Sequence, residues 1–308
     1  MQRSGVLDGV GDVRKLSLSA IPTREAHGTA VMVEPRYFDR VYKINPYMEG
    51  SIDRDRARTQ WEHLRETLES CADDVRVLDP RETQELVDDV TAPLASNRPD
   101  MVFVANHALP TPTGEGFVLA RMATDERAGE PRHFAAWARR QGYDVATAPA
   151  ATFEGMGDAL WHPGRELLWG GYGVRSEREA YDELVDRLDV PLISLELTSE
   201  YYYHLDVSLA PLSESTALVQ PEAFTDDALA KIAAVFETVL EAPPAESTAA
   251  LAVNLEVFDG TVVLGTEAPE TTQLLEGAGF DVVTVDTGEF QKAGGSVCCL
   301  TLTAGTPS

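Results

Sequence analysis

The sequence predicts a fold of the α/β or α+β class, because strand-like and helix-like segments alternate along most of its 308 residues. A strand-strand-helix-strand order also recurs about every 50 residues, which suggests a structural repeat without a strict sequence repeat. Hydrophobic residues make up 44% of the chain, enough to bury a full core as one large domain or two moderate ones.

Hydrophobic periodicity assigns the elements in chain order. Residues 1–28 lack clear periodicity and are expected to form a loosely ordered extension, followed by a single domain over residues 29–308. Strands are expected at residues 29–34, 101–105, 116–122, 144–147 and 166–169. Helices are expected at residues 53–68, which place Trp61, Leu64 and Leu68 on one face, and around Phe134, Trp137 and Ala138.

The alternation continues in the second half of the chain. Ser176 and Glu179 have the spacing of a capping box, which predicts a helix that buries Tyr181, Leu184, Val185 and Leu188. Thr225, followed by two aspartates, is expected to cap a helix that buries Leu229, Ile232, Val235, Phe236 and Val239. Strands are expected at residues 192–197, 203–209, 261–264 and 281–285, a helix around residues 271–275, and a closing strand that contains Cys299. Residues 241–248, rich in Ala, Pro and Ser, are expected to form a loop or linker.

The charge balance argues against nucleic acid as a partner, because 51 acidic residues face 25 basic ones and the net charge is −26. The acids are scattered and only four residues are lysine, which indicates a halophilic cytoplasm, with an ordinary acidic protein as the alternative. No apolar run approaches the roughly 20 residues that span a bilayer, and no signal core is seen. The three cysteines, Cys71, Cys298 and Cys299, form no disulfide framework. We therefore expect a cytoplasmic protein that has reduced thiols and does not contact the membrane.

Cys299 is the strongest candidate for chemistry, since Gly294 and Gly295 lead the chain to it beside a strand-like run. A thiol becomes a nucleophile when a base is near, and His204 and Asp206 supply an imidazole and a carboxylate two residues apart. The alternative is that Cys299 is a small buried hydrophobic residue.

Other polar residues lie at positions typical of binding sites. Glu154 stands in a glycine-rich turn, and Asn106 ends an apolar segment. Arg127 and Arg175 each lie near glycine and could hold a carboxylate with two hydrogen bonds. Taken singly, these residues are equally explained as a surface turn, a strand end and surface ion pairs. The other histidines, at positions 27, 63, 107, 133 and 162, are interpreted as packed or solvated.

Six motifs, taken in order, resemble the guanidino-group-modifying (pentein) superfamily, in its dimethylarginine dimethylaminohydrolase, arginine dihydrolase and amidinotransferase-like branch. They are Val33-Glu34-Pro35, Ile44-Asn45-Pro46-Tyr47-Met48, Phe103-Val104-Ala105-Asn106, Phe153-Glu154-Gly155, Tyr203-His204-Leu205-Asp206 and residues 294–302. The resemblance covers residues 29–303 and implies a five-fold pseudosymmetric α/β propeller of ββαβ modules around a central channel.

The resemblance also implies site roles. Cys299 corresponds to the nucleophile, His204 to the general acid/base, Glu154 to an acid beside the histidine and the guanidinium, and Asp206 to a guanidinium-binding carboxylate. Arg127 and Arg175 match arginines near the substrate carboxylate, and Asn45 and Asn106 match polar positions of dihydrolase-like members. No metal or other cofactor is implied, the partner is a small guanidino compound, and a homo-oligomer is left open.

The function implied is a cysteine hydrolase that attacks the guanidino carbon of arginine or a methylated arginine. It would form a covalent S-alkylthiouronium and release ammonia or a methylamine. Asn106 stands where deiminase-like members commonly have a carboxylate, which favours a site able to hold citrulline for a second cycle. The alternatives are an amidinotransferase and, more distantly, a non-catalytic binding protein.

Cys298 departs from the pattern of the relatives, which often carry a larger polar residue there. In an extended strand its side chain would point away from Cys299, so we interpret it as structural or redox-sensitive, with a role as substitute nucleophile as the alternative. Diverging thiols also argue against a metal site built from Cys298, Cys299 and His204.

Overall fold

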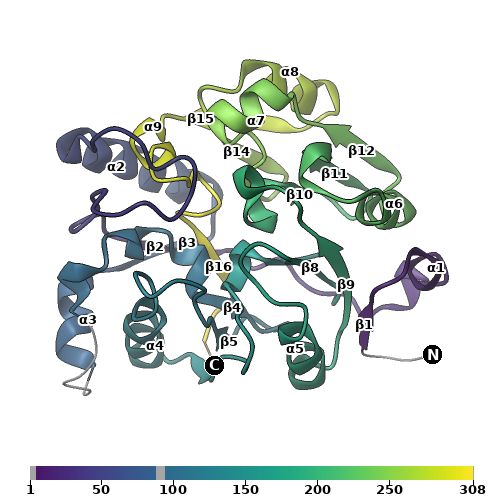
Figure 1. Ribbon diagram of the computed structural model, residues 1–308, viewed down its shortest axis with the longest axis horizontal. Helices are drawn as coiled ribbons and strands as arrows, with labels where there is room; N and C mark the ends of the chain where they lie inside the picture. The colour runs from purple at the N-terminus through teal and green to yellow at the C-terminus, as the bar shows by residue number, and fades with distance from the viewer. Residues whose placement is uncertain (1–4, 88–93, 308) are drawn as a thin grey trace.

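Five small sheets with one shared strand order make up the computed structural model, which describes residues 5–87 and 94–307. In each sheet the first strand is antiparallel to the second, a helix follows the second, and the third strand is parallel to the second. Figure 1 shows the strands toward the middle of the molecule and the helices at its edge. The predicted mixed α/β class and its recurring unit are confirmed.

Each unit, called a module below, consists of three strands and one helix. The first is β16 (Leu302–Ala304), β2 (Thr29–Val33), α2 (Arg54–Cys71) and β3 (Asp74–Leu78), and the second is β4 (Ala108–Pro110), β5 (Gly116–Leu119), α4 (Glu130–Arg140) and β6 (Asp144–Ala146). The third is β7 (Ala159–Trp161), β8 (Leu168–Tyr172), α5 (Ala180–Leu188) and β9 (Pro191–Glu196). The fourth is β10 (Leu209–Pro211), β11 (Thr216–Val219), α6 (Asp226–Val235) and β12 (Thr238–Glu241). The fifth is β13 (Glu256–Phe258), β14 (Thr261–Gly265), α8 (Pro269–Gly277) and β15 (Asp281–Val285).

The first module joins the two ends of the chain. Its first strand, β16, comes from the C-terminal end and pairs with β2, so that Leu302 lies opposite Val31. The first strands begin at residues 108, 159, 209, 256 and 302, which puts successive modules 51, 50, 47 and 46 residues apart. The sequence predicts a repeat about every 50 residues, and the spacing of the modules confirms it.

The module helices begin and pack largely as their sequences predict. The Asp53 side chain accepts a hydrogen bond from the Arg56 amide at the start of α2, and Thr225 caps α6 by accepting one from the Ala228 amide. Trp61, Leu64 and Leu68 of α2 are buried, as expected from their spacing. By contrast, α5 begins after Glu179 without any side-chain cap, so the capping box predicted for Ser176 and Glu179 is wrong.

Five other expectations about elements are wrong. Residues 101–105 and 203–209 form 3-10 turns instead of strands, apart from Leu209 at the start of β10. Residues 241–248, expected to be a loop, include the start of α7 (Pro244–Ala250). The helix capped by Thr225 ends at Val235, so Phe236 lies beyond it and Val239 belongs to β12. Cys299 lies in a turn before β16 and not in a strand.

The described part of the N-terminal extension is ordered, contrary to expectation. Strand β1 (Gly5–Leu7) adds to the third module by pairing in parallel with β9, and α1 (Val10–Val13) packs near α6. Asp8 then binds both Arg178 and Ser194. Residues 1–4 lie outside the described residues, within which no helix has the length and apolar character needed to cross a membrane.

A short buried segment precedes the first strand of every module, and we call these five pieces the entry segments. Three of them are 3-10 turns, η4 (Val104–His107), η5 (Gly155–Gly157) and η7 (Leu205–Val207), and two are turns at residues 252–254 and 297–300. They pack against one another: η5 contacts both η4 and η7, and the Ala105 amide donates to the Cys299 carbonyl at 3.3 Å. The repeat therefore brings five distant parts of the chain to one place.

Candidate functional site

The entry segments carry the polar residues singled out in the sequence. They supply Asn106, Asp206, Asn254 and Cys299, and Glu154 and His204 directly precede two of them. Each of these six residues is at most 2% exposed. Buried polar groups are costly unless they are paired, so a cluster of this kind indicates a functional site.

The Cys299 thiol contacts a carboxylate at the centre of the cluster. Its Sγ donates to Asp206 Oδ2 at 3.1 Å, and its backbone amide donates to Asn254 Oδ1 at 3.1 Å. Burial, together with the negative charge of Asp206, raises the pKa of the thiol well above its ordinary value. Burial also raises the pKa of Asp206 to about 7, although hydrogen bonds from Cys299 and Asn254 oppose this. The empty site therefore holds a protonated thiol at neutral pH.

The two glycines before Cys299 are required by the geometry of the turn. Gly294 has φ of +95°, a conformation that side chains disfavour, and a Cβ on Gly295 would lie 2.4 Å from the Phe103 ring. The sequence interpretation that this pair delivers Cys299 is confirmed, although the turn and not a strand sets its direction.

His204 is held by Glu154. Its Nε2 lies 2.6 Å from Glu154 Oε2, while the Ala123 amide donates to Glu154 Oε1 at 2.8 Å. Burial acts to raise the pKa of Glu154, but the hydrogen bond and charge of His204, with the charges of Arg175 and Arg127, outweigh it and hold the pKa at about 2. Glu154 is thus charged at any physiological pH and fixes the orientation of the imidazole.

Ser176 supports this pair instead of capping a helix. Its hydroxyl donates to Asp158 Oδ2 at 2.6 Å and accepts from the Glu154 amide at 2.9 Å. Asp158 Oδ1 in turn accepts from the Leu205 amide at 3.1 Å, next to His204. The Ser176–Asp158 pair therefore ties the Glu154 segment to the His204 segment.

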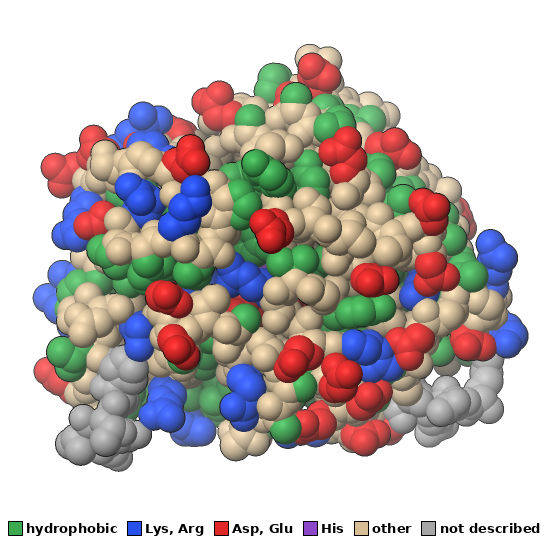
Figure 2. All heavy atoms as spheres, viewed as in Figure 1, with side chains coloured by type: hydrophobic (Ala, Val, Ile, Leu, Met, Phe, Trp, Pro, Cys, Tyr) green, Lys and Arg blue, Asp and Glu red, His purple; other side chains and the backbone are tan. Residues whose placement is uncertain are grey.

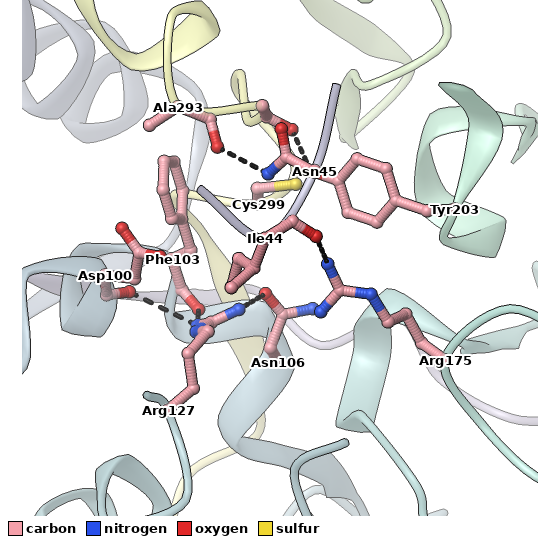
Figure 3. Close-up of a pocket in the computed structure, with 11 residues that line it drawn as sticks. Ile44, Asn45, Asp100, Phe103, Asn106, Arg127, Arg175, Tyr203, Ala293 and Cys299 are labelled. Atoms are coloured by element: carbon pink, nitrogen blue, oxygen red, sulfur yellow. Dashed lines mark hydrogen bonds between the residues drawn. The ribbon is translucent and has the colours of Figure 1, made fainter. Parts of the chain in front are cut away.

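A small cavity, called the front pocket below, lies beside Cys299. Figure 3 shows Ile44, Asn45, Tyr203 and the two arginines around the thiol. Further lining residues not assigned a role from the sequence include Asp100, Phe103 and Ala293.

The two arginines have different surroundings. Arg127 is 4% exposed, and it donates to Glu130 Oε2 at 2.9 Å and to Asn106 Oδ1 at 2.8 Å, with two backbone carbonyls as further acceptors. Arg175 donates to the Ile44 carbonyl at 2.6 Å and lies 5.1 Å from the centre of the Tyr203 ring (Figure 3). Arg127 thus orients Asn106, whereas Arg175 binds the backbone of Ile44, which lines the front pocket.

Asn45 is likewise engaged with protein groups. Its Nδ2 donates to the Ala293 carbonyl at 3.0 Å, and its Oδ1 accepts from the Tyr47 amide at 2.9 Å. It thereby fastens the Ile44 segment beside Gly294. Of the histidines interpreted as packed or solvated, His63 is exposed and the others are buried.

Asn254 is the site residue that the sequence reasoning missed. Its Oδ1 accepts from the amides of Ser296 and Cys299, and its Nδ2 donates to the Asp206 carbonyl at 3.2 Å. The repeat contained a signal, since Asn254 precedes β13 by two residues, as Asn106 precedes β4. Within residues 5–87 and 94–307, no group of three or more His, Cys, Asp or Glu side chains could hold a metal ion.

Comparison with known proteins places this arrangement in a family. No protein-family model matches the chain. The bifunctional arginine dihydrolase/ornithine cyclodeaminase ArgZ of Synechocystis is 36% identical over 287 residues, which are 90% of this chain and 38% of that protein. The N(G),N(G)-dimethylarginine dimethylaminohydrolase of Mycobacterium tuberculosis is 35% identical over 274 residues, 88% of this chain and 84% of that protein. The chain thus spans less than half of the bifunctional relative and most of the second one.

Solved structures agree with these relatives. The N-terminal domain of ArgZ bound to product, an arginine dihydrolase from cyanobacteria, matches with a TM-score of 0.81 and 34% identity, over 91% of this chain and 98% of that one. A dimethylarginine dimethylaminohydrolase adduct matches with a TM-score of 0.70 at 22% identity, over 90% of this chain and 99% of that one, which shows likeness of fold alone. The chain therefore belongs to the pentein superfamily of guanidino-group-modifying enzymes, as a relative of the arginine dihydrolases and dimethylarginine dimethylaminohydrolases.

Proposed function

We propose that this protein is a cysteine hydrolase that acts on the guanidino carbon of arginine or a methylated arginine. The observation that carries the proposal is the contact of the Cys299 thiol with Asp206, in the same buried cluster as the His204–Glu154 pair. Related structures of ArgZ with substrate, with product and covalently bound to a reaction intermediate support it.

Substrate binding would prepare both the electrophile and the nucleophile. A guanidinium spreads its charge over three nitrogens and is a poor electrophile, so carboxylates must orient it while its central carbon stays open. Asp206, which contacts Cys299, and Glu154, which contacts His204, are suited to this. The bound cation would also favour the thiolate over the thiol, whose pKa is raised by burial in the empty site.

The two chemical steps then share one base. The Cys299 thiol gives its proton to His204, the thiolate attacks the guanidino carbon, and His204 passes the proton to the leaving amine as the carbon–nitrogen bond breaks. Neutral His204 next takes a proton from water, which attacks the thiouronium carbon and frees Cys299 together with a ureido product. Glu154, charged beside the imidazole at 2.6 Å, stabilises His204 while it carries the proton within each step.

Asn106 favours the dihydrolase outcome, in which a ureido compound reacts a second time to give ornithine. Arg127 occupies the Asn106 Oδ1, so that the amide nitrogen is directed toward His204, 3.5 Å from Nδ1. An amide hydrogen can donate to the carbonyl oxygen of a ureido group, which a carboxylate cannot do. We propose that Arg127 acts through Asn106, and that Arg175 is the arginine that meets the substrate carboxylate.

The proposal extends to the architecture. We propose that the five modules close into a pseudosymmetric propeller and that residues 29–308 act as one catalytic domain. The shared module topology and the pairing of β16 with β2 support this arrangement. An acidic, lysine-poor composition and the lack of a cysteine framework further support work in the reducing, salt-rich cytoplasm of a cell.

A product assay tests the function. Purified protein in high-salt buffer receives arginine or asymmetric dimethylarginine, and mass spectrometry identifies the products. Ornithine from arginine supports the dihydrolase, and citrulline with dimethylamine from the methylated substrate supports the dimethylaminohydrolase. A new guanidino compound that forms only when an amine acceptor is added would instead identify an amidinotransferase. Absence of turnover with both substrates and without such a product would contradict the proposal.

A further inference from the structure

A second cavity of about 440 Å³ lies behind Cys299, and we call it the back chamber. It shares no lining residue with the front pocket. Cys299 lines the front pocket, whereas its neighbour Cys298 and its hydrogen-bond partner Asp206 line the back chamber. Strands β7, β10, β13 and β16, each the first strand of its module, contribute residues to its walls. The back chamber therefore lies near the middle of the fold, on the opposite side of the entry segments from the front pocket.

The back chamber contains two buried carboxyl groups with unused acceptors. Glu256 is 9% exposed and Asp206 is 1% exposed. In the described part of the chain, Glu256 Oε1 and Asp206 Oδ1 are buried atoms without a hydrogen-bond partner. The Glu256 carboxyl also interacts with the thiol of Cys298 and with the backbone amide of Val257. Unpaired buried acceptors are costly, and a donor that carries positive charge would satisfy them.

The remaining lining favours a small cation with apolar substituents. Met156, Leu160, Leu209, Leu212 and Phe280 contribute apolar walls. The charged groups that line the chamber besides Asp206 and Glu256 are Asp259 and Arg24, whose guanidinium lies 4.7 Å from the centre of the Trp161 ring. Burial and the charge of Arg24 lower the pKa of His27 to about 3, so this histidine is neutral. Three acids thus face one arginine.

We propose that the back chamber receives the amine released at Cys299, ammonia or a small alkylamine, and holds it as a cation against Glu256. The inference rests on the proposed hydrolase function. The leaving nitrogen lies beside Asp206 when its bond to the guanidino carbon breaks, and Asp206 is the residue that both contacts the Cys299 thiol and lines the chamber. Release on this side leaves the front pocket to the covalently held remainder of the substrate.

The proton balance fits Glu256. The amine leaves as a neutral molecule after His204 has supplied one proton. The carboxylic acid of Glu256 then transfers its proton to the amine nitrogen, which gives an ammonium–carboxylate pair without any other reactant. Burial raises the pKa of Glu256 to about 8, so that it is protonated at neutral pH, while an alkylammonium resembles lysine with a pKa of about 10.4.

Binding of dimethylammonium to the Cys299→Ala protein tests the inference without any turnover. The amine is titrated as its chloride and followed by calorimetry or ligand-observed NMR, with sodium chloride holding the ionic strength constant. We expect saturable binding that weakens at least about tenfold in a Cys299→Ala, Glu256→Gln double variant, because a charge-assisted hydrogen bond is lost. An added Asp259→Asn change is the matched control: it removes an exposed carboxylate of the same chamber and should leave binding within about twofold.

A second variant guards against misfolding. Leu212→Trp fills the chamber without removing a charge and should weaken amine binding as strongly as Glu256→Gln does, with the thermal midpoint recorded for both. Absence of saturable binding, or binding that Glu256→Gln leaves unchanged, would overturn the inference. Failure of the proposed function has a different signature, because wild-type protein would then form no ureido or ornithine product.

Discussion

We propose that Asp206 serves the chemistry at a cost in stability. It is 1% exposed and accepts the Cys299 thiol at 3.1 Å, yet its other oxygen has no partner among the described residues. A carboxylate in such surroundings is poorly solvated, which is why burial raises its pKa to about 7. A guanidinium would supply the missing charge, so the site is strained when empty and satisfied when occupied.

The Asp206→Asn variant should therefore be more stable than wild type at high pH, and inactive. Unfolded Asp206 loses its proton near its ordinary pKa of 3.8, and the folded group keeps it until about pH 7, so the wild type loses stability as pH rises through that window. We expect the free energy of unfolding of the variant to exceed that of the wild type by about 2–4 kcal/mol at pH 8 and to differ little from it at pH 4. Denaturant unfolding at the two pH values measures the difference. A stability difference between variant and wild type that is equal at the two pH values would contradict the raised pKa of Asp206.

At the scale of elements, the entry segments decide where the chemistry occurs. Each is short, buried and irregular, and each leads into a first strand of only three residues. Their conformation depends on contacts among distant segments, such as the Asn254 side chain that holds the amides of Ser296 and Cys299. Local changes in these segments should therefore affect activity more than similar changes elsewhere.

Gly294→Ala tests this expectation. Gly294 has φ of +95°, and a Cβ there would lie 2.5 Å from the Tyr203 hydroxyl and 2.7 Å from Asn45 Nδ2. We expect a loss of about 2–3 kcal/mol in stability and at least about a tenfold drop in kcat, from backbone strain plus displacement of the Cys299 turn.

Gly279→Ala is the matched control for this substitution. Gly279 has φ of +94°, but a Cβ there would meet nothing within 4 Å. The Gly279→Ala variant should lose only about 1 kcal/mol in stability and keep its activity. Equal effects of the two substitutions on kcat would show that the Cys299 turn is not the sensitive element.

The contrast between regular elements and entry segments explains which parts of the fold the sequence could predict. Helices such as α2 and strands such as β14 carry a clear period and lie where the sequence placed them. Residues 101–105 are as apolar as a buried strand, and residues 203–209 alternate apolar and polar side chains like a half-buried strand, so periodicity could not separate either 3-10 turn from a strand. Ser176 matched a helix-cap pattern because the spacing alone does not show that its hydroxyl is bound to Asp158.

The site itself was predicted from order and residue type, and Asn254 shows the limit of that approach. Cys299, His204, Glu154 and Asp206 do lie together. A single asparagine has many ordinary uses, so Asn254 stands out only when the modules are aligned at their first strands. Cys298 and Cys299 line different cavities, but the expectation that they diverge assumed a strand, whereas both residues lie in a turn.

At the scale of the whole molecule, charge is the dominant feature. The net charge is −26, and Figure 2 shows acidic side chains spread over the visible face, interspersed with basic ones and not gathered in one patch. Such a surface repels itself at low ionic strength, because little screening separates the charges. Salt should relieve this repulsion more than it weakens the scattered surface ion pairs.

The thermal midpoint should therefore rise by several degrees between about 0.1 M and about 2 M KCl. Sodium chloride at the same concentrations should have a similar effect, because screening does not depend on the identity of the cation. Calorimetry or far-ultraviolet circular dichroism measures the midpoints. A midpoint that is constant or falls with salt would contradict the halophilic interpretation.

The most direct test of the central claim is to trap the covalent intermediate on Cys299. Wild-type protein is mixed with arginine or dimethylarginine, quenched in acid and digested, and the peptides are analysed by mass spectrometry. We predict a substrate-derived mass on Cys299 that is absent from the Cys299→Ala variant, whose turnover should fall at least about 10³-fold. Cys298→Ala, which changes the adjacent thiol of the back chamber, should keep the adduct. Undiminished turnover in Cys299→Ala, or an adduct on Cys298 instead, would contradict the account.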